Sequence, residues 1–421
     1  MHPHVGFVLL LTLLLSQLFS KVNGQLPNHP PLYTMNKSTI IMPCNESGFT
    51  SIDSVRGWGI IDFDWSNGKE IWDKNTPMND EELLFEQVQM TTSASPGTTV
   101  WVYRCSVYAY PWYTSVRTIL DDPAYKSWFL QFKADAPWYS PKCDNNSGKC
   151  SDYYHMQEQT PGFPTGDGNC AAPACDCGTM PCGFYMFNHS STVVVNGQTF
   201  LDWFLHSYMF NEVGSSPLVS GFFWDDDWTG TCSFPDSGAS NGTICSDTGM
   251  TQSDVTMITS SYRANMAALE TETLSRGKFS WQMLWTGGSA DAKGSTGPNP
   301  LVTPTACATQ LRALCNADSP QNNNRTLMYA FSNRDPSLSN HTLFTADLAN
   351  FLLTRGDYAY IGHGWLGCSR DYAFPDELNS DYGTPVDKLC KETSTGVFER
   401  EWTKASVKME CDTFKGTITL K

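Results

Sequence analysis

Residues 220–230 read SGFFWDDDWTG, an apolar run that ends in three consecutive aspartates, Asp225, Asp226 and Asp227. Carboxylates are costly beside a hydrophobic core unless they are paired, hydrated or functional. In a parallel α/β barrel, the side chains that carry the chemistry collect where the strands end and the loops begin. The stretch is therefore predicted to be a barrel strand whose terminal acids face a substrate cavity.

Strand and helix patterns alternate on both sides of this stretch. The predicted strands cover residues 57–65, 98–109, 182–188, 218–226, 279–285, 327–333 and 357–365, and the predicted helices cover 80–90, 116–132, 199–210, 252–276, 306–315 and 342–356. Such alternation indicates an α/β fold with a parallel sheet, either open and doubly wound or closed as a (β/α)8 barrel. No glycine-rich phosphate loop follows an early strand, which favours the barrel, with one strand unidentified.

The remaining segments divide the chain into regions. Residues 25–54 are predicted to be an irregular lead-in, 55–370 the barrel, 134–182 a disulfide-rich insertion within it, and 371–421 a C-terminal extension of antiparallel strands. The cysteines of CAAPACDCGTMPC lack the paired C-x2-C units of structural zinc, so disulfides are expected there.

Three features predict a secreted glycoprotein. Residues 1–24 have the short apolar run and the small residue at the cleavage point of a signal peptide, with an uncleaved anchor as the alternative, and no later segment is apolar enough to span a membrane. The chain has seven N-x-S/T sequons and 15 cysteines, an odd number that leaves at least one free or paired between chains. A net charge of −16 disfavours nucleic acid as a partner and is compatible with a neutral substrate.

Acids and polar residues recur at the predicted strand ends. Asp62 and Asp64 alternate with apolar residues and are expected to point into the barrel mouth, close to Asp225 and Asp226. Paired carboxylates with tryptophan platforms are typical of a glycoside-cleaving site. The predicted catalytic residues are Asp225, Asp226 and Asp62, and the predicted substrate-binding residues are Asp64, Arg104, Tyr108, Trp228, Trp285, His363 and Trp365.

Each of these residues also has a structural interpretation. The aspartates could form a solvated turn, a helix cap or a calcium site. Arg104 could serve only to neutralise acids, His363 could be a hydrogen-bonded core histidine, and Trp228 and Trp365 could be packing residues. No metal or other cofactor is predicted.

Several stretches together resemble a family of secreted eukaryotic proteins, many from algae and related protists, that are described as hypothetical glycosyl hydrolases with glycosidase-like (β/α)8 barrels. They are GIIDFDWSNGKEIW, QEQTPGFPTGDGNCAAPACDCG, SGFFWDDDW and GVFEREWTKASVKMECDTFKGTI. The resemblance implies that Asp225 or Asp226 follows the fourth strand, where retaining α-glycosidase barrels place the nucleophile, and that Asp62 and Asp64 match an acidic position that binds sugar hydroxyls. It implies an aspartate where this chain has Asn188.

The sequence thus favours a secreted glycoside hydrolase-like protein with a carbohydrate as its substrate or ligand. Asp225 is the expected nucleophile, and Asp226, Asp62 and Glu158 are the candidates for the acid/base. Two other functions remain open at this point: a non-catalytic carbohydrate-binding or cell-surface protein that uses the same barrel, and a matrix protein cross-linked through the odd cysteine.

Overall fold

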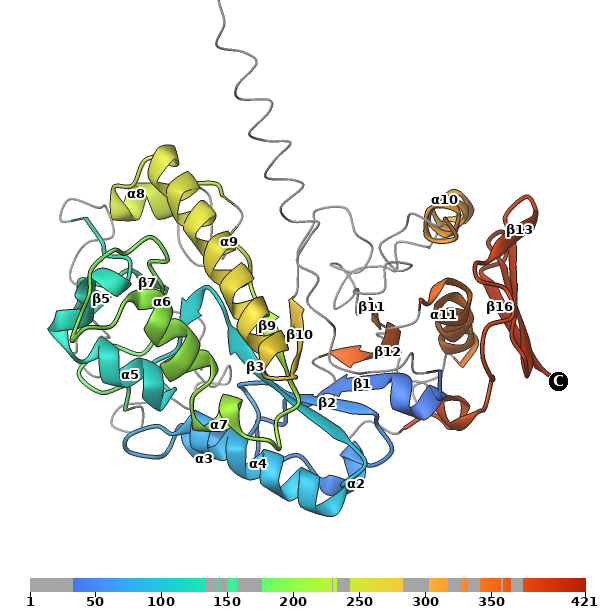
Figure 1. The fold of residues 1–421 in the computed structure, drawn as a ribbon, viewed down its shortest axis with the longest axis horizontal. Helices are drawn as coiled ribbons and strands as arrows, with labels where there is room; N and C mark the ends of the chain where they lie inside the picture. The colour runs from blue at the N-terminus through green and yellow to red at the C-terminus, as the bar shows by residue number, and fades with distance from the viewer. Residues whose placement is uncertain are drawn as a thin grey trace, which may run out of the picture.

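The fold is described from a computed structural model (Figure 1). The structure describes residues 33–133, 142–143, 150–156, 176–228, 230–232, 243–282, 303–316, 328–331, 341–356, 359–364 and 374–421.

A curled sheet of seven parallel strands forms the centre of an α/β fold (Figure 1). Its order is β10-β9-β3-β2-β1-β12-β11, so neighbouring strands follow the chain and the last strand, β12, pairs with the first, β1. Among the described strands, β10 and β11 form the two ends of this order. The strands are β1 (Thr39–Met42), β2 (Ile60–Phe63), β3 (Thr99–Cys105), β9 (Gly221–Asp225), β10 (Phe279–Gln282), β11 (Met328–Phe331) and β12 (Ala359–Gly364).

The two faces of this sheet bury different sets of side chains. Alternate residues of β2 separate cleanly, because Ile61 and Phe63 belong to the main core whereas Ile60 joins a second cluster with Trp101 and Tyr360. Successive side chains of a strand point to opposite faces, so the small cluster lies on the concave, inner face of the curled sheet and the main core lies under the helices. Asp62 is two residues from Ile60 and therefore shares the inner face.

Helices cover the outer face. The α-helices are α2 (Ile52–Val55), α3 (Lys69–Trp72), α4 (Asp80–Ala94), α5 (Thr114–Leu120), α6 (Phe200–Trp203), α7 (Glu212–Ser215), α8 (Ile244–Thr248), α9 (Gln252–Ser275), α10 (Pro304–Leu314) and α11 (His341–Thr354); η1 (Met35–Ser38), η2 (Pro123–Trp128) and η6 (Asp376–Asn379) are 3-10 helices, and η3 (Phe204–Met209) is π-helical. The longest, α9, begins at a capping box between Thr251 and Asp254 and stops before Gly277, whose φ is 68°.

Two predicted regions differ from the structure. Residues 39–42 were expected in an irregular lead-in but form β1, whose four residues are all buried because strands lie on both of its sides. The segment 182–188 was expected to be the third parallel strand. Its strand β8 (Phe184–Met186) instead pairs antiparallel with β4 (Tyr108–Ala109) and β7 (His155–Met156) in a small separate sheet. A further hairpin joins β5 (Lys142–Cys143) and β6 (Cys150–Ser151).

The C-terminal extension is a four-stranded antiparallel sheet at one end of the molecule (red in Figure 1). It consists of β13 (Lys391–Ser394), β14 (Val397–Glu401), β15 (Ala405–Glu410) and β16 (Lys415–Leu420) and lies against α11. Arg400 donates hydrogen bonds to the carbonyls of Leu352, Leu353 and Arg355 at the end of α11. This guanidinium therefore caps the helix and fastens the sheet to it.

Disulfides occur in several parts of the described chain, namely Cys177–Cys182, Cys232–Cys245, Cys307–Cys411 and Cys315–Cys390. The first lies in the segment where disulfides were expected, whose Cys170 and Cys175 fall outside the described residues. Cys105 is free and buried. In the described part of the chain, no helix has the length and apolar character needed to cross a bilayer.

Candidate active site

Carboxyl groups from two strands meet on the inner face of the sheet. Asp62 lies in β2 opposite Trp101 of β3, and Asp225 ends β9 opposite Cys105, on the other side of β3. The charges of Asp64 and Asp225 both act on Asp62, and the charge of Asp64 acts on Asp225. The structure thus brings Asp62, Asp64 and Asp225 to one electrostatic site, at the strand ends where the sequence predicted them.

Strand β3, which lies between the two acidic strands, supplies one donor to Asp225 at the end of β9 and one to Asp226 directly after it. The hydroxyl of Tyr103 donates to Oδ2 of Asp225 at 2.9 Å, and the thiol of Cys105 donates to Oδ2 of Asp226 at 3.1 Å. Tyr103 and Cys105 are two residues apart and therefore share a face of the strand. The two carboxyl groups are consequently held from the same side of the sheet.

Consecutive residues of a regular strand could not both reach that side. The backbone of Asp226 solves this by turning into the left-handed region, with φ 65°, directly after β9 ends. A non-glycine residue in this region costs on the order of 1–3 kcal/mol, and such strain concentrates at functional sites. The turn thus lets two neighbouring aspartates both accept hydrogen bonds from side chains on one face of β3.

Hydrogen bonds on all sides fix the strained residue. Ser106 Oγ donates to the carbonyl of Asp226 at 3.0 Å, and the hydroxyl of Tyr262 in α9 donates to the same carbonyl at 3.1 Å. The amide of Asp226 donates to Oδ1 of Asp225 at 2.9 Å. The backbone carbonyl of Ser106 in turn contacts Nε2 of the buried His189 at 2.8 Å. Helix α9 and the loop after β8 therefore support the turn.

Burial gives these acids an unusual affinity for protons. Burial, followed by the charges of Asp64 and Asp225, raises the pKa of Asp62 well above its usual value. In the described structure neither oxygen of Asp62 has a hydrogen-bond partner, and the side chain is fully buried. Burial also raises the pKa of Asp225, and it raises the pKa of Asp226 to about 6. Burial thus shifts the pKa values of all three carboxyl groups toward the neutral range.

Aromatic residues surround the acids. The hydroxyl of Tyr110 lies 3.0 Å from that of Tyr103, and the ring of Tyr110 stacks on Trp112 at 4.7 Å. Trp65, which is partly exposed, follows Asp64 and lies 5.5 Å from the Tyr110 ring. The sequence interpretation missed Tyr103, Cys105, Tyr110 and Trp65. Strand alternation identifies the first two, because positions 101, 103 and 105 must share a face.

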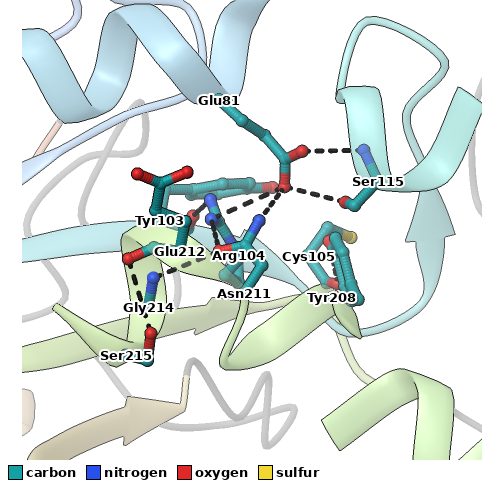
Figure 2. A network of polar contacts seen from close by, with 10 residues as sticks. All are labelled: Glu81, Tyr103, Arg104, Cys105, Ser115, Tyr208, Asn211, Glu212, Gly214 and Ser215. Carbon is teal, nitrogen blue, oxygen red and sulfur yellow. Dashed lines mark hydrogen bonds and ion pairs between the residues drawn. The ribbon is translucent and has the colours of Figure 1, made fainter. Parts of the chain in front are cut away.

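Arg104 does not belong to this site, contrary to the prediction that it binds substrate. It lies between Tyr103 and Cys105 in β3, so its side chain points to the outer face, where its guanidinium is fully buried 3.6 Å from Glu81 of α4 (Figure 2). Glu81 also accepts hydrogen bonds from Ser115 and from Asn211, the N-cap residue of α7 (Figure 2). The network joins β3 to three helices and is structural.

The other predicted binding residues are placed as follows. Tyr108 is partly exposed and close to Asp226, whose charge contributes to raising the pKa of the tyrosine after the larger effect of burial. Trp228 is fully buried, so its ring packs in the core and offers no platform. His363 lies in β12 opposite Ile41. Trp285, Trp365 and Glu158 lie outside the described residues.

Asn188 lies in the loop after β8, a strand of the small antiparallel sheet, and so does not end a parallel strand. Its amide donates to the carbonyl of Ser127 at 3.1 Å. The prediction that this position ends the third parallel strand is therefore wrong. Within the described ranges, no group of three or more histidine, cysteine or acidic side chains has an arrangement that could hold a metal ion.

No family model matches this chain, and no curated protein matches it. Solved structures do. A debranching enzyme of Nostoc punctiforme soaked with acarbose is 11% identical with a TM-score of 0.46, the match covering 91% of each chain. Sucrose 6F-phosphate phosphorylase from Thermoanaerobacter thermosaccharolyticum is 9% identical with a TM-score of 0.46, covering 93% of this chain and 97% of the other.

An α-amylase of Geobacillus thermoleovorans complexed with acarbose is 9% identical, with a TM-score of 0.38 over 89% of this chain and 86% of the other. The structural neighbours thus include glycosidases. At TM-scores below 0.5, the strand order described above, rather than these matches, defines the fold.

Proposed function

We propose that this chain is a glycoside hydrolase that cleaves an O-glycosidic bond of an oligo- or polysaccharide. The observation that carries the proposal is the pair of carboxyl groups, Asp225 and Asp226, that the left-handed turn presents on one side of β3. Glycoside hydrolysis requires two carboxyl groups in different protonation states, one acid and one nucleophile or base.

In this proposal Asp225 is the nucleophile. Its carboxyl group accepts hydrogen bonds from the Tyr103 hydroxyl and the Asp226 amide, which hold it in place and partly offset burial and the charge of Asp226, the larger effects that raise its pKa. Asp226, with a pKa of about 6, is the acid/base. Its proton passes to the departing glycosidic oxygen while Asp225 attacks the anomeric carbon. The Asp226 carboxylate then takes a proton from the water that attacks the same carbon, which frees Asp225 and gives retention of configuration.

Asp62 has the third role. It is fully buried and without a hydrogen-bond partner in the described structure, so it would contact sugar hydroxyls only if the substrate displaced the residues that cover it, and its raised pKa makes it the second candidate for the acid. Asp64 accepts hydrogen bonds from the amide and hydroxyl of Ser66 and contributes negative charge to the site. A binding role for His363, Trp285 and Trp365 stays part of the proposal.

The strand order, in which β12 returns to pair with β1, supports a glycosidase-like barrel. The disulfides favour an oxidising compartment, which supports secretion after removal of residues 1–24. We expect a neutral carbohydrate as the substrate, since anionic polymers would be repelled by the acidic site.

The test is a screen of the purified, disulfide-intact protein against a panel of aryl α- and β-glycosides and oligosaccharides. For the substrate that is cleaved, Asp225→Asn is compared with Asp227→Asn, a matched control two residues further along the chain. Asp225→Asn should reduce kcat by roughly 10³-fold or more, because an amide cannot attack the anomeric carbon. Asp227→Asn should remain within a few-fold of the wild type.

Product stereochemistry, followed by NMR, should show retention. Equal loss of activity in both variants, or inversion, would refute the role given to Asp225. Binding of a sugar from the panel without any cleavage would instead identify a non-catalytic carbohydrate-binding protein.

A further inference from the structure

One group at this site has no role in the mechanism above, the free thiol of Cys105. Its side chain is fully buried on the inner face of β3. The sulfur accepts a hydrogen bond from the amide of Tyr108 at 3.1 Å and donates to Oδ2 of Asp226 at 3.1 Å. It is therefore oriented on both sides rather than simply packed.

The direction of these bonds decides what the thiol does. Because a backbone N–H occupies a lone pair of the sulfur, the S–H bond is left to point at Asp226. Burial, and the charges of Asp226 and Asp225, raise the pKa of this thiol well above its usual value, so it stays a neutral donor. A neutral donor stabilises the carboxylate form of its partner more than the protonated form.

We infer that Cys105 is a positioning residue for Asp226: its thiol holds the acid/base carboxyl group in the orientation that the left-handed turn creates and sets how readily that group gives up its proton. The effect on catalysis rests on the proposed function. The contact between the thiol and the carboxyl group is independent of that function.

Other groups that face Asp226 bear on its titration. Asp225 and Asp227 flank it in the chain. The others are tyrosines, namely Tyr103 in β3, Tyr108 and Tyr110 in the segment after β3, and Tyr262 in α9. Burial raises the pKa of each of these tyrosines, so they remain neutral through the range in which Asp226 titrates. The charge of Asp227 acts on Asp226, and the charge of Asp226 acts on Asp225; both aspartates are unchanged in every variant below.

The experiment compares Cys105→Ala, which removes the donor, with Cys105→Ser, which keeps one. Tyr208→Phe is the matched control, because the Tyr208 hydroxyl donates to the carbonyl of Cys105 at 2.9 Å and does not bind the thiol. In Cys105→Ala the alkaline limb of the pH profile of kcat should move upward by roughly half to one pH unit, the effect of one net hydrogen bond. In the same variant kcat should fall roughly threefold to tenfold with KM little changed.

Cys105→Ser should return the limb to the wild-type position or below it, and Tyr208→Phe should leave it unmoved. A Cys105→Ala profile that coincides with the wild type, or a Cys105→Ser profile that coincides with Cys105→Ala, would overturn the inference.

A second readout needs no turnover. Carboxyl carbon NMR of the protein labelled at aspartate follows the titration of Asp226 directly, with Asp226→Asn identifying the signal. The midpoint should rise in Cys105→Ala by the same roughly half to one pH unit and return in Cys105→Ser. If the midpoint shifts in Cys105→Ala but the wild-type protein cleaves no glycoside, the proposed function is refuted while the effect of the thiol on Asp226 is supported. An unshifted midpoint in an active enzyme would defeat the inference alone.

Discussion

The hydroxyl of Tyr103 provides the sharpest test of the role given to Asp225. Tyr103→Phe removes one O–H group and keeps the ring, which packs 5.7 Å from Phe223 and stacks on Tyr110 at 6.3 Å. The lost bond, 2.9 Å to Oδ2 of Asp225, is one to a carboxylate. Hydrogen bonds to charged groups contribute about 1.5–3 kcal/mol, and about 1.4 kcal/mol is tenfold in rate. The expected loss in kcat/KM is therefore roughly 10- to 150-fold.

The pH profile should change in a defined direction. The Tyr103 bond lowers the pKa of Asp225 relative to the same buried carboxyl group without it. Its removal raises that pKa further, so the acid limb of kcat/KM, where the nucleophile must ionise, should move to higher pH. The measurement is kcat/KM between about pH 4 and 8 with a glycoside that the wild type cleaves.

Tyr110→Phe is the control, because its hydroxyl contacts Tyr103 at 3.0 Å and donates to neither aspartate of the pair. It should lose less than about fivefold, the effect of one neutral hydrogen bond. Activity of Tyr103→Phe within twofold of the wild type, or an equal loss in Tyr110→Phe, would refute the reasoning.

Three further predictions concern stability. Glu81→Gln should destabilise the fold by about 3–5 kcal/mol in urea unfolding, because it leaves the fully buried Arg104 without its ion-pair partner; an unchanged midpoint would show that the pair is dispensable. Asp62→Asn should be more stable than the wild type at pH 7 and lose that advantage toward pH 3. The folded-state pKa of Asp62 is raised, so the wild type loses stability as pH rises above the unfolded value of about 4, and melting curves at several pH values check this. Arg400→Lys should cost about 2–4 kcal/mol, because a point charge cannot reproduce the bonds that cap α11; a loss below about 0.5 kcal/mol would contradict the capping role.

Local sequence patterns predicted much of the parallel sheet. Strands β2, β3, β9, β10, β11 and β12 all lie within predicted strands, since buried parallel strands read as apolar runs between turns and helices. Strand β1 was not predicted because its four residues follow a segment rich in proline and asparagine, and a run of four residues is too short to show a periodic pattern. Strand β8 was misplaced because pairing direction is a property of the partner strands and leaves no mark on the FYM sequence itself.

The site residues that lie in strands could be predicted from the alternation of side chains along a strand, whereas the residues of the turn after β9 could not. Asp62 was placed correctly on the inner face from its parity with Ile60. The same rule, applied to β3, excludes Arg104 and selects Tyr103 and Cys105. The left-handed turn at Asp226 could not be predicted, because a DDD run fits several turns and it is the contacts with Ser106 and Tyr262 that select this one.

The pairing of the last parallel strand with the first has a consequence for biosynthesis. Strand β1 can acquire its partner β12 only after residue 364 has left the ribosome, and the disulfide Cys307–Cys411 encloses a separation of 104 residues. Contacts this distant along the chain form late and slowly. A growing chain therefore keeps the edge of β1 that faces β12 unpaired for most of its synthesis, although the other edge can pair with β2 early. We expect the protein to depend on chaperones and disulfide isomerases while it is being made, and to be discarded when translation stops early.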